Sequence, residues 1–198
     1  RGIVFCGLGN NGADGIAIAR LLNEKGISTD ICKIKDLLKE KGKTSDSFQV
    51  QESIYHAYKY PVKNNIDEIK NEKYDFVIDA VFGIGLSRNL NNEYSSILQS
   101  INDINAVKIA VDMPSGINAD NGQVMGCAVK CDYTITFSFG KLGQYLWPGN
   151  EYAGETKVVD MGITTRSWLD KKPSCATLEE TDFIHLPKRM SHSNKGTY

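Results

Sequence analysis

Apolar runs alternate with amphipathic stretches along most of the chain. Each run is short and rich in β-branched or aromatic residues, which is typical of a buried β-strand. The runs lack the regular polar alternation of a half-exposed strand, so we expect both faces of the sheet to be covered. This pattern predicts strands at Gly2–Cys6, Ile27–Ile34, Asp75–Phe82, Val107–Asp112, Tyr133–Phe139 and Thr156–Asp160.

Helical patterns separate several of these strands. We predict helices over Gly15–Lys25, which Gly26 ends, over Ser45–Tyr58 and over Asn92–Ile104. Strands that alternate with helices form βαβ units and a mostly parallel sheet. The predicted fold class is therefore α/β, with a doubly wound sheet that binds its ligand beyond the carboxyl ends of the strands.

The composition argues against nucleic acid and membranes as partners. The chain has 198 residues, 23 of them basic and 24 acidic, for a net charge of −1. This balance predicts no nucleic-acid partner, and no apolar run approaches the ~20 residues of a membrane span. The five cysteines lack the spacing of a zinc site or a disulfide framework, so we expect reduced thiols and a cytoplasmic location.

The pattern changes toward the end of the chain. Residues 1–164 carry the strands and helices and form the expected domain, whereas Thr165–Lys188 is polar and typical of a linker. Residues 189–198 are interpreted as the start of a further domain. The sequence has no initial Met and opens directly on a predicted strand, so we expect a piece of a longer protein.

A glycine-rich loop over Gly7–Gly15 follows the first strand. Three of its glycines have the spacing of the dinucleotide-binding fingerprint, in which a helix N-terminus holds a phosphate: Gly7, Gly9 and Gly12. Asn10, Asn11 and Asp14 make this loop unusually polar. An acid repels phosphate unless it meets a cation or caps the helix, and N-capping is an equally good interpretation of Asp14.

A second polar segment runs from Asp79 to Arg88. Asp79 stands in an apolar strand, where burial of an unpaired carboxylate is costly, so it requires a cation, a cluster of donors or solvent. The glycine-rich turn and Arg88 can form an anion cradle, because arginine binds phosphate through two parallel hydrogen bonds. A turn with a solvated Arg88 is the alternative interpretation.

A third polar segment follows the next strand. Asp112 ends that strand, and Pro114 and Gly116 impose a turn that holds Ser115 in place. A partly desolvated acid at a sheet edge can transfer protons, although it can equally bind the N–H groups of its own loop as a structural acid. Lys141 follows a later strand and is either a cation or proton donor for this site or a solvated surface lysine.

Asn11, Asp79 and Ser115 offer only oxygen ligands, from three predicted strand ends. Hard oxygen ligands suit a hard cation and do not suit zinc or copper. A single carboxylate with neutral oxygens favours a weakly held monovalent ion over a divalent one, so we expect a monovalent cation site.

Four motifs in this order resemble the NAD(P)H-hydrate epimerase family, the YjeF N-terminal domain. The family's loop Gly-x-Gly-Asn-Asn-Gly-Gly-Asp-Gly is similar to Gly7–Gly15, with Ala13 in place of one glycine. The other three motifs are similar to Asp79–Leu86, Val111–Gly116 and Phe137–Gly143. The resemblance covers about Gly2–Ile163 and is far more specific than a glycine loop alone.

The resemblance implies a Rossmann-like three-layer αβα sandwich and an isomerase of metabolite repair. The reaction interconverts the R and S epimers of hydrated NADH or NADPH, so that a dehydratase specific for one epimer can repair the whole pool. Our hypothesis for this reaction has Asp112 as the general acid/base at the hydroxyl-bearing ring carbon, with Lys141 as a second proton donor or a charge partner. The resemblance also implies a potassium ion held by Asn11, Asp79 and Ser115. Substrate contacts fall on Asn10, Asn11, Gly12, Ala13, Asp14, Gly83, Ile84, Gly85, Leu86, Ser87, Arg88 and Asp112.

The same resemblance implies partners in the parent protein. The family forms homodimers and usually carries a helical segment before the first strand, which can complete the site and the dimer. Leu186–Tyr198 resembles the opening of an ADP- or ATP-dependent NAD(P)H-hydrate dehydratase domain, with Asn194 in place of a histidine. We therefore expect the parent to be a bifunctional repair enzyme, with lyase activity in its C-terminal domain.

Two other classes of protein stay open. A non-catalytic module of the same fold would bind a nucleotide or an RNA complex, and binding of an NAD(P)-type ligand tests it. An NAD(P)-dependent oxidoreductase needs an acid about 20 residues after the glycines, and Asp36 stands 24 positions after Gly12. Hydride transfer tests that class.

Overall fold

The computed structural model describes residues 1–38, 42–164, 175–178, 180–183 and 194. The chain divides into two units, Arg1–Gly162 and Ile163–Tyr198. The boundary thus lies within two residues of the one predicted at 164. Of the second unit, the structure describes a 3-10 turn at Glu180–Phe183 and a few other residues. Most of the predicted linker, and all of residues 189–198 except Asn194, lie outside the described residues.

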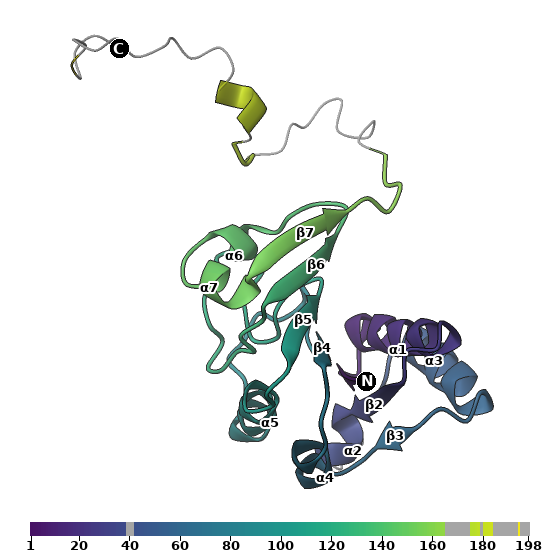
Figure 1. Ribbon diagram of the computed structural model, residues 1–198. Helices are drawn as coiled ribbons and strands as arrows, with labels where there is room; N and C mark the ends of the chain where they lie inside the picture. The colour runs from purple at the N-terminus through teal and green to yellow at the C-terminus, as the bar shows by residue number, and fades with distance from the viewer. Residues whose placement is uncertain (39–41, 165–174, 179, 184–193, 195–198) are drawn as a thin grey trace. The chain divides into compact units, whose positions relative to one another are not determined.

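The first unit is built on a seven-stranded sheet in the order β3-β2-β1-β4-β5-β6-β7, and every strand pair in it is parallel (Figure 1). This arrangement confirms the predicted doubly wound α/β fold. The strand order reverses between β1 and β4, so the ligand site of such a sheet lies at the carboxyl ends of these two strands. The strands are β1 Gly2–Cys6, β2 Thr29–Lys33, β3 Val62–Lys63, β4 Phe76–Ala80, β5 Val107–Val111, β6 Tyr133–Phe137 and β7 Glu155–Val159.

Helices cover the central strands on both faces. On one face lie α1 (Asn10–Glu24) and α3 (Asp46–Ala57), and on the other α2 (Ile34–Leu38), α4 (Ile66–Asn71) and α5 (Asn92–Asn102). Two short helices, α6 (Leu142–Tyr145) and α7 (Gly149–Ala153), connect β6 to β7.

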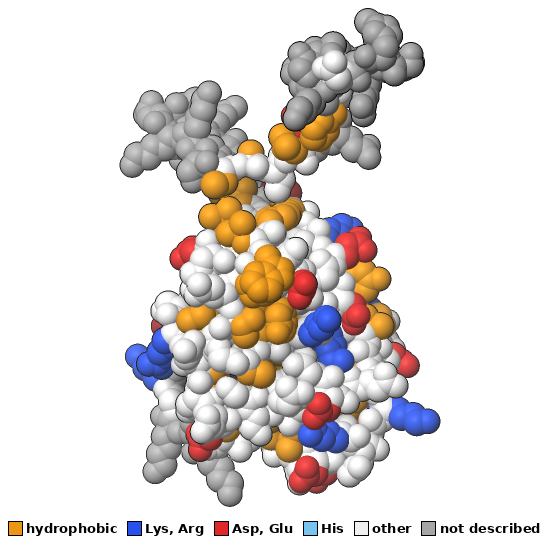
Figure 2. Space-filling view, turned by 90° about the vertical axis from the view of Figure 1, so that its left-hand side faces the viewer, with side chains coloured by type: hydrophobic (Ala, Val, Ile, Leu, Met, Phe, Trp, Pro, Cys, Tyr) orange, Lys and Arg blue, Asp and Glu red, His pale blue; other side chains and the backbone are white. Residues whose placement is uncertain are grey.

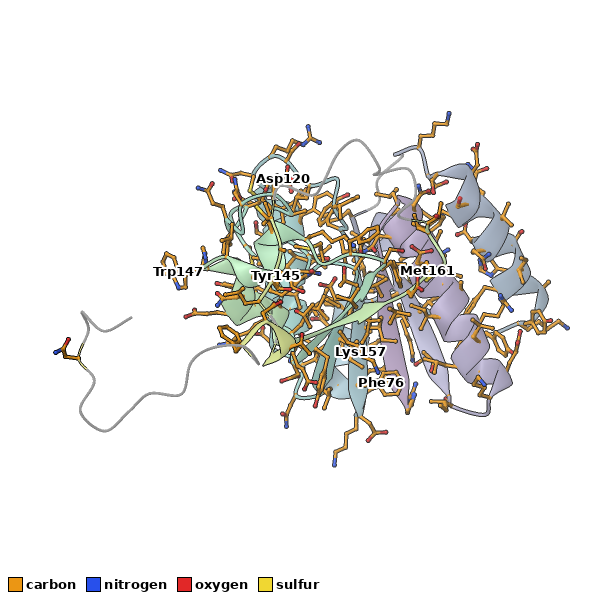
Figure 3. All side chains as sticks on the ribbon, turned by 90° about the horizontal axis from the view of Figure 1, so that it is seen from above. Phe76, Asp120, Tyr145, Trp147, Lys157 and Met161 are labelled. Carbon is orange, nitrogen blue, oxygen red and sulfur yellow. The ribbon has the colours of Figure 1, made fainter. Side chains whose placement is uncertain are left out.

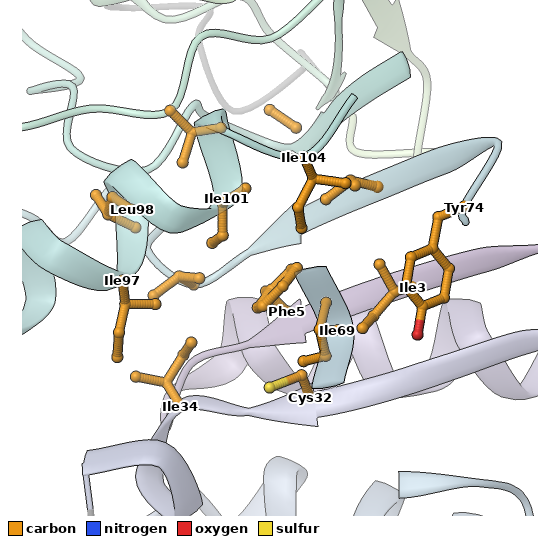
Figure 4. Packing of buried hydrophobic residues seen from close by; sticks show 14 of the residues in the cluster. Ile3, Phe5, Cys32, Ile34, Ile69, Tyr74, Ile97, Leu98, Ile101 and Ile104 are labelled. Atoms are coloured by element: carbon orange, nitrogen blue, oxygen red, sulfur yellow. The ribbon is translucent and has the colours of Figure 1, made fainter. Parts of the chain in front are cut away.

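Alternate residues of β1 enter two separate hydrophobic cores because side chains alternate across a strand. Val4 packs with α1 and α3, and Phe5 packs on the other face with α4 and α5 (Figure 4). All five residues of β1 are buried, as are all five of β2. The continuous apolar runs of the sequence therefore correspond to strands covered on both sides, as predicted.

The half of the sheet formed by β6 and β7 is less covered, and three residues of β7 are exposed. Hydrophobic side chains gather in a band on the face shown in Figure 2, the side on which α6 and α7 lie. The exposed side chains around α6 include Leu142, Tyr145, Leu146 and Trp147, and Trp147 is 74% exposed and points outward (Figure 3). No helix within the described residues is long and apolar enough to cross a membrane.

Three sequence-based boundaries were wrong for identifiable reasons. The helix after the first strand begins at Asn10 and not at Gly15, so that most of the predicted loop is helical. β5 ends at Val111 and β6 at Phe137, because Asp112 and Ser138 have positive φ angles that no extended strand accepts. The short elements β3, α2 and α4 were not predicted.

Candidate active site

A cavity of about 850 Å³ opens at the carboxyl ends of β1 and β4. The loop after β1, the turn after β4 and the first residue after β5 meet there, as the topology requires. Gly12 and Ala13, predicted to contact substrate, do not line this cavity because they are buried in the first turns of α1. It is lined by Leu8, Gly9, Asn10, Asn11, Asp14, Val81, Phe82, Gly83, Ile84, Gly85, Leu86, Ser87, Arg88 and Asp112.

The glycines that start α1 serve close packing. A side chain at Gly12 would collide with the carbonyl of Gly7, and one at Gly15 would collide with Ala80 of β4. These glycines let α1 lie directly against the sheet and begin at the cavity. The N-cap is Gly9, with no side-chain cap, so the interpretation of Asp14 as the N-cap was wrong. Asp14 is an exposed residue further along the helix and lines the cavity.

Asp79 and Ser115 form a buried pair behind the cavity, and both are 0% exposed. The Asp79 carboxylate accepts hydrogen bonds from the Ser115 N–H (2.7 Å), the Ser115 hydroxyl (2.5 Å) and the Val81 N–H (3.3 Å). Burial raises the pKa of Asp79 to about 6, although these hydrogen bonds act in the opposite direction. Of the three surroundings that the sequence left open for Asp79, the structure shows a cluster of donors, and all of them are uncharged.

Asp112 stands at the edge of the cavity with its side chain 14% exposed. Its φ is +66°, in the left-handed region, which costs a non-glycine residue roughly 1–3 kcal/mol. One carboxylate oxygen accepts hydrogen bonds from the Thr136 hydroxyl (3.0 Å) and the Phe137 N–H (3.2 Å) of β6. The neighbouring strand thus fixes the direction of this carboxylate.

Lys141 forms an ion pair with the same oxygen of Asp112. Its ammonium also donates to the Thr136 hydroxyl (2.8 Å) and to the Phe137 carbonyl (3.1 Å). Lys141 does not line the cavity and lies behind Asp112. This placement favours the charge-partner interpretation over direct proton donation, and Lys141 is not a solvated surface lysine.

Asp14 is the second carboxylate of the cavity. Burial and the negative charge of Asp112 raise the pKa of Asp14 above its ordinary value. The described residues form no ion pair with Asp14, whereas Asp112 has a lysine beside it. The two carboxylates therefore face one cavity in opposite electrostatic environments, which is the arrangement of an acid and a base.

Arg88 is exposed and lines the cavity, and the described residues offer it no ion pair. A neighbouring cavity of about 490 Å³ shares Arg88, Phe82 and Leu86 with the first. A third, of about 610 Å³, shares the loop Leu8–Asn10 and extends toward the start of α3. Together they form an extended site that suits an elongated ligand.

The predicted cation ligands can be tested against this geometry. The Nδ2 atom of Asn11 is buried without a hydrogen-bond partner, and the Asn11 amide lies against Gly83. A half-turn of the amide places its oxygen at the orphaned position, where a cation would satisfy it. Asn11, Asp79 and Ser115 offer only oxygen donors, and a monovalent ion at these residues stays a prediction. The described part of the chain contains no cluster of three or more His, Cys, Asp or Glu side chains suited to a tightly bound metal.

Asp36, the acid that an NAD(P)-dependent oxidoreductase would use, is engaged elsewhere. Its carboxylate forms an ion pair with Lys33 at 2.9 Å, and Lys33 also pairs with Glu52 at 2.8 Å. Asp36 does not line the cavity at the glycine loop. The structure therefore gives this acid a structural role at the end of β2.

Sequence reasoning missed three groups that support Asp112: the Thr136 hydroxyl, the Phe137 N–H and the amide of Gln144. Thr136 reads as an ordinary strand residue, and a backbone N–H leaves no signal in a sequence. Gln144 stands three residues after Lys141, and its amide accepts from the Lys141 N–H at 2.8 Å, which is half of a capping box. The glutamine three residues after Lys141 was the signal that the sequence offered for this contact.

Comparison with known proteins finds one family model and several named relatives. The family model of the YjeF-related protein N-terminus matches residues 2–143. A protein of Oenococcus oeni called NAD(P)H-hydrate epimerase is 44% identical over 161 residues, which are 81% of this chain and 74% of that protein. Another of the same name, from Limosilactobacillus fermentum, is 42% identical over 80% of this chain and 73% of its own length.

A longer relative and a solved structure extend the comparison. The bifunctional NAD(P)H-hydrate repair enzyme Nnr of Thermofilum pendens is 34% identical over 197 residues, 98% of this chain and 37% of that protein. The crystal structure of yeast ynu0 has a TM-score of 0.67 and 20% identity, over 84% of this chain and 68% of that one. The latter likeness shows a shared fold.

Proposed function

The chain belongs to the family of YjeF-related protein N-termini, and from that membership we propose that it is an NAD(P)H-hydrate epimerase. It interconverts the two epimers of hydrated NADH or NADPH and so takes part in repair of these cofactors. The observation that carries this conclusion is the Asp112–Lys141 ion pair, whose carboxylate faces the cavity at the point where the strand order reverses.

Inversion of a hydroxyl-bearing ring carbon requires a bond at that carbon to break and to form again on the other face. Both steps need a proton to be taken from one atom and returned to another. We assign this transfer to the Asp112 carboxylate, which the strand β6 orients and which forms an ion pair with the Lys141 ammonium. Lys141 acts through Asp112 because it does not line the cavity.

The extended cavity suits the rest of a dinucleotide. α1 has 15 residues and begins at the cavity without a side-chain cap and without an acid in its first turn. Such a helix end favours an anion, and the dinucleotide substrate carries a diphosphate. The exposed guanidinium of Arg88 adds a second positive group beside the turn after β4.

Potassium is part of the proposal. Asn11, Asp79 and Ser115 would hold the ion, on the support of the orphaned Asn11 amide and the all-oxygen donor set. When bound, the ion would supply positive charge that offsets the buried Asp79 carboxylate and attracts the anionic substrate.

The parent protein extends the same proposal. The similarity to the bifunctional enzyme of Thermofilum pendens runs over 197 residues and so supports a C-terminal dehydratase domain in the parent. This domain would give the parent lyase activity. We also propose that the protein forms a homodimer and is cytoplasmic, as expected in the sequence analysis. Sedimentation of the parent protein measures whether it is a dimer.

A stereospecific repair assay tests the function. R-hydrated NADH is supplied with an S-specific dehydratase and its nucleotide, and the return of nicotinamide absorbance is followed with and without the protein, in potassium or in sodium. We expect the protein to accelerate repair above spontaneous epimerisation, and more so in potassium. If neither this chain nor its full-length parent accelerates repair while an NAD(P)-type ligand still binds, the non-catalytic module is the correct class.

A further inference from the structure

The backbone at Asp112 adopts a conformation that non-glycine residues rarely accept. Its φ of +66° is accompanied by a hydrogen bond from the Met113 N–H to the Val111 carbonyl at 2.8 Å, which closes a γ-turn around Asp112. A γ-turn with positive φ is rare and strained. Such a conformation persists only when the surrounding structure holds it in place.

The Gln144 amide makes the contact that holds this turn from outside. Gln144 is only 3% exposed. Its Nε2 donates to the carbonyl of Asp112 at 2.6 Å, and its Oε1 accepts from the backbone N–H of Lys141 at 2.8 Å. One side chain therefore joins the backbones of the two residues of the ion pair, and uses both ends of its amide to do so.

Gln144 is itself carried on a fixed element. The N–H of Gly143 donates to the carbonyl of Ala119 at 2.7 Å, and a Cβ at Gly143 would collide with the carbonyl of Asn118. α6 therefore packs directly on the loop that follows Asp112. Because its support is close-packed, a movement of the Gln144 amide would require a movement of the whole turn.

We propose that Gln144 is a positioning residue for epimerisation: it holds the Asp112 turn and the Lys141 backbone in the arrangement that directs the carboxylate into the cavity. Gln144 does not line the cavity, so it acts through Asp112 and not on the substrate. The inference rests on the proposed function, since it gives Gln144 a role in the reaction assigned to Asp112.

The variant Gln144→Met tests this role, because methionine fills the same volume without either hydrogen bond. We expect kcat to fall by about tenfold to a hundredfold, since a displacement of about 1 Å can cost a hundredfold in rate. KM should change less than kcat, because no substrate contact is removed. The matched control is Gln123→Met at an exposed position, which should leave both constants unchanged.

A double-mutant cycle separates positioning from general stability. If Gln144 acts through Asp112, then Gln144→Met should lower the residual rate of an Asp112→Asn enzyme by less than about twofold, because coupled residues are not additive. Equal losses in both backgrounds, or an unchanged kcat in Gln144→Met alone, would overturn the proposal. If Gln144→Met does not fold, Gln144→Glu serves in the same cycle, since an ionised glutamate keeps the acceptor for Lys141 and loses the donor to Asp112.

Hydrogen exchange distinguishes failure of this inference from failure of the proposed function. An inactive wild-type protein would reject the function, yet the Met113 amide would still report on the turn. We expect that amide to exchange about tenfold faster in Gln144→Met than in the wild type. An unchanged exchange rate would reject the positioning role whatever the enzyme's activity.

Discussion

Two carboxylates end neighbouring strands at the same edge of the sheet, and their surroundings differ. Asp79 on β4 is fully buried, and its partners are the uncharged donors of Ser115 and Val81, so the pKa of Asp79 rises to about 6. Asp112 after β5 reaches the cavity, stands in a left-handed turn and has the Lys141 ammonium against it.

The contrast shows that a place at the sheet edge does not fix the role of an acid. The role of each acid depends on the side chain that the next strand along the sheet, or the turn after that strand, places against its carboxylate. β5 and its turn give Asp79 a serine, which leaves a negative charge for a cation to neutralise. β6 and the segment after it give Asp112 a lysine, which forms an ion pair with one of its carboxylate oxygens at the edge of the cavity. The three predictions that follow test this division.

The largest effect should come from Asp112→Asn. Asparagine tolerates the left-handed backbone, so the fold should be kept while proton transfer is lost. We expect turnover to fall by about a thousandfold, within the 10²–10⁴ range of general acid–base catalysis. The stereospecific repair assay measures it, with Asp120→Asn on an exposed loop as the control (Figure 3). Turnover within tenfold of the wild type would end the assignment of Asp112.

Asp79→Asn should change the response to potassium more than the fold. Asparagine keeps an acceptor for the Ser115 N–H but removes the charge that a cation needs. In the wild type, potassium at ten times its dissociation constant should stabilise the protein by about 1.4 kcal/mol, which raises the melting temperature by roughly 3–6 °C.

Thermal unfolding in potassium and in sodium measures this difference. The wild type and Asp120→Asn should both melt at a higher temperature in potassium, whereas Asp79→Asn should melt at the same temperature in both salts. An equal potassium effect in Asp79→Asn would show that the ion binds elsewhere or that Asp79 does not hold it.

The smallest effect concerns Asp14, which lines the same cavity as Asp112. The negative charge of Asp112 contributes to the raised pKa of Asp14, and like charges favour the protonated acid. Removal of that charge in Asp112→Asn should therefore lower the pKa of Asp14 only in part, because partial burial in the wall of the cavity, the larger cause of the raised pKa, is retained. Carbon-13 NMR titration of the Asp14 carboxyl measures the change, and no change would mean that the two carboxylates do not interact.

The sheet could be predicted well from the sequence, because runs of apolar residues mark its buried strands. The meeting of the loops at one edge could be predicted as well, because parallel strands all end at the same edge. The strand Gly2–Cys6 was found at its true ends, whereas β2 and β4 are shorter than the predicted Ile27–Ile34 and Asp75–Phe82. The start of α1 was missed because glycine and asparagine are poor helix formers, while the close contact of Gly12 with Gly7 is a tertiary effect.

The sequence pointed to most of the residues that line the cavity, but not to the contacts that hold Asp112 in place. Asp79, Asp112 and Ser115 stood out as polar residues at strand ends. The bond from Gln144 to Asp112 spans 32 positions and depends on how α6 packs, and no local pattern encodes such a contact. The position of Lys141 behind Asp112, out of the cavity, depends on the same packing.

The supports of Asp112 come later in the chain than Asp112 itself, which bears on biosynthesis. Thr136, Phe137, Lys141 and Gln144 are all translated after the acid that they hold. The site around Asp112 is therefore complete only after the chain has been made as far as Gln144 and β6 has paired with β5.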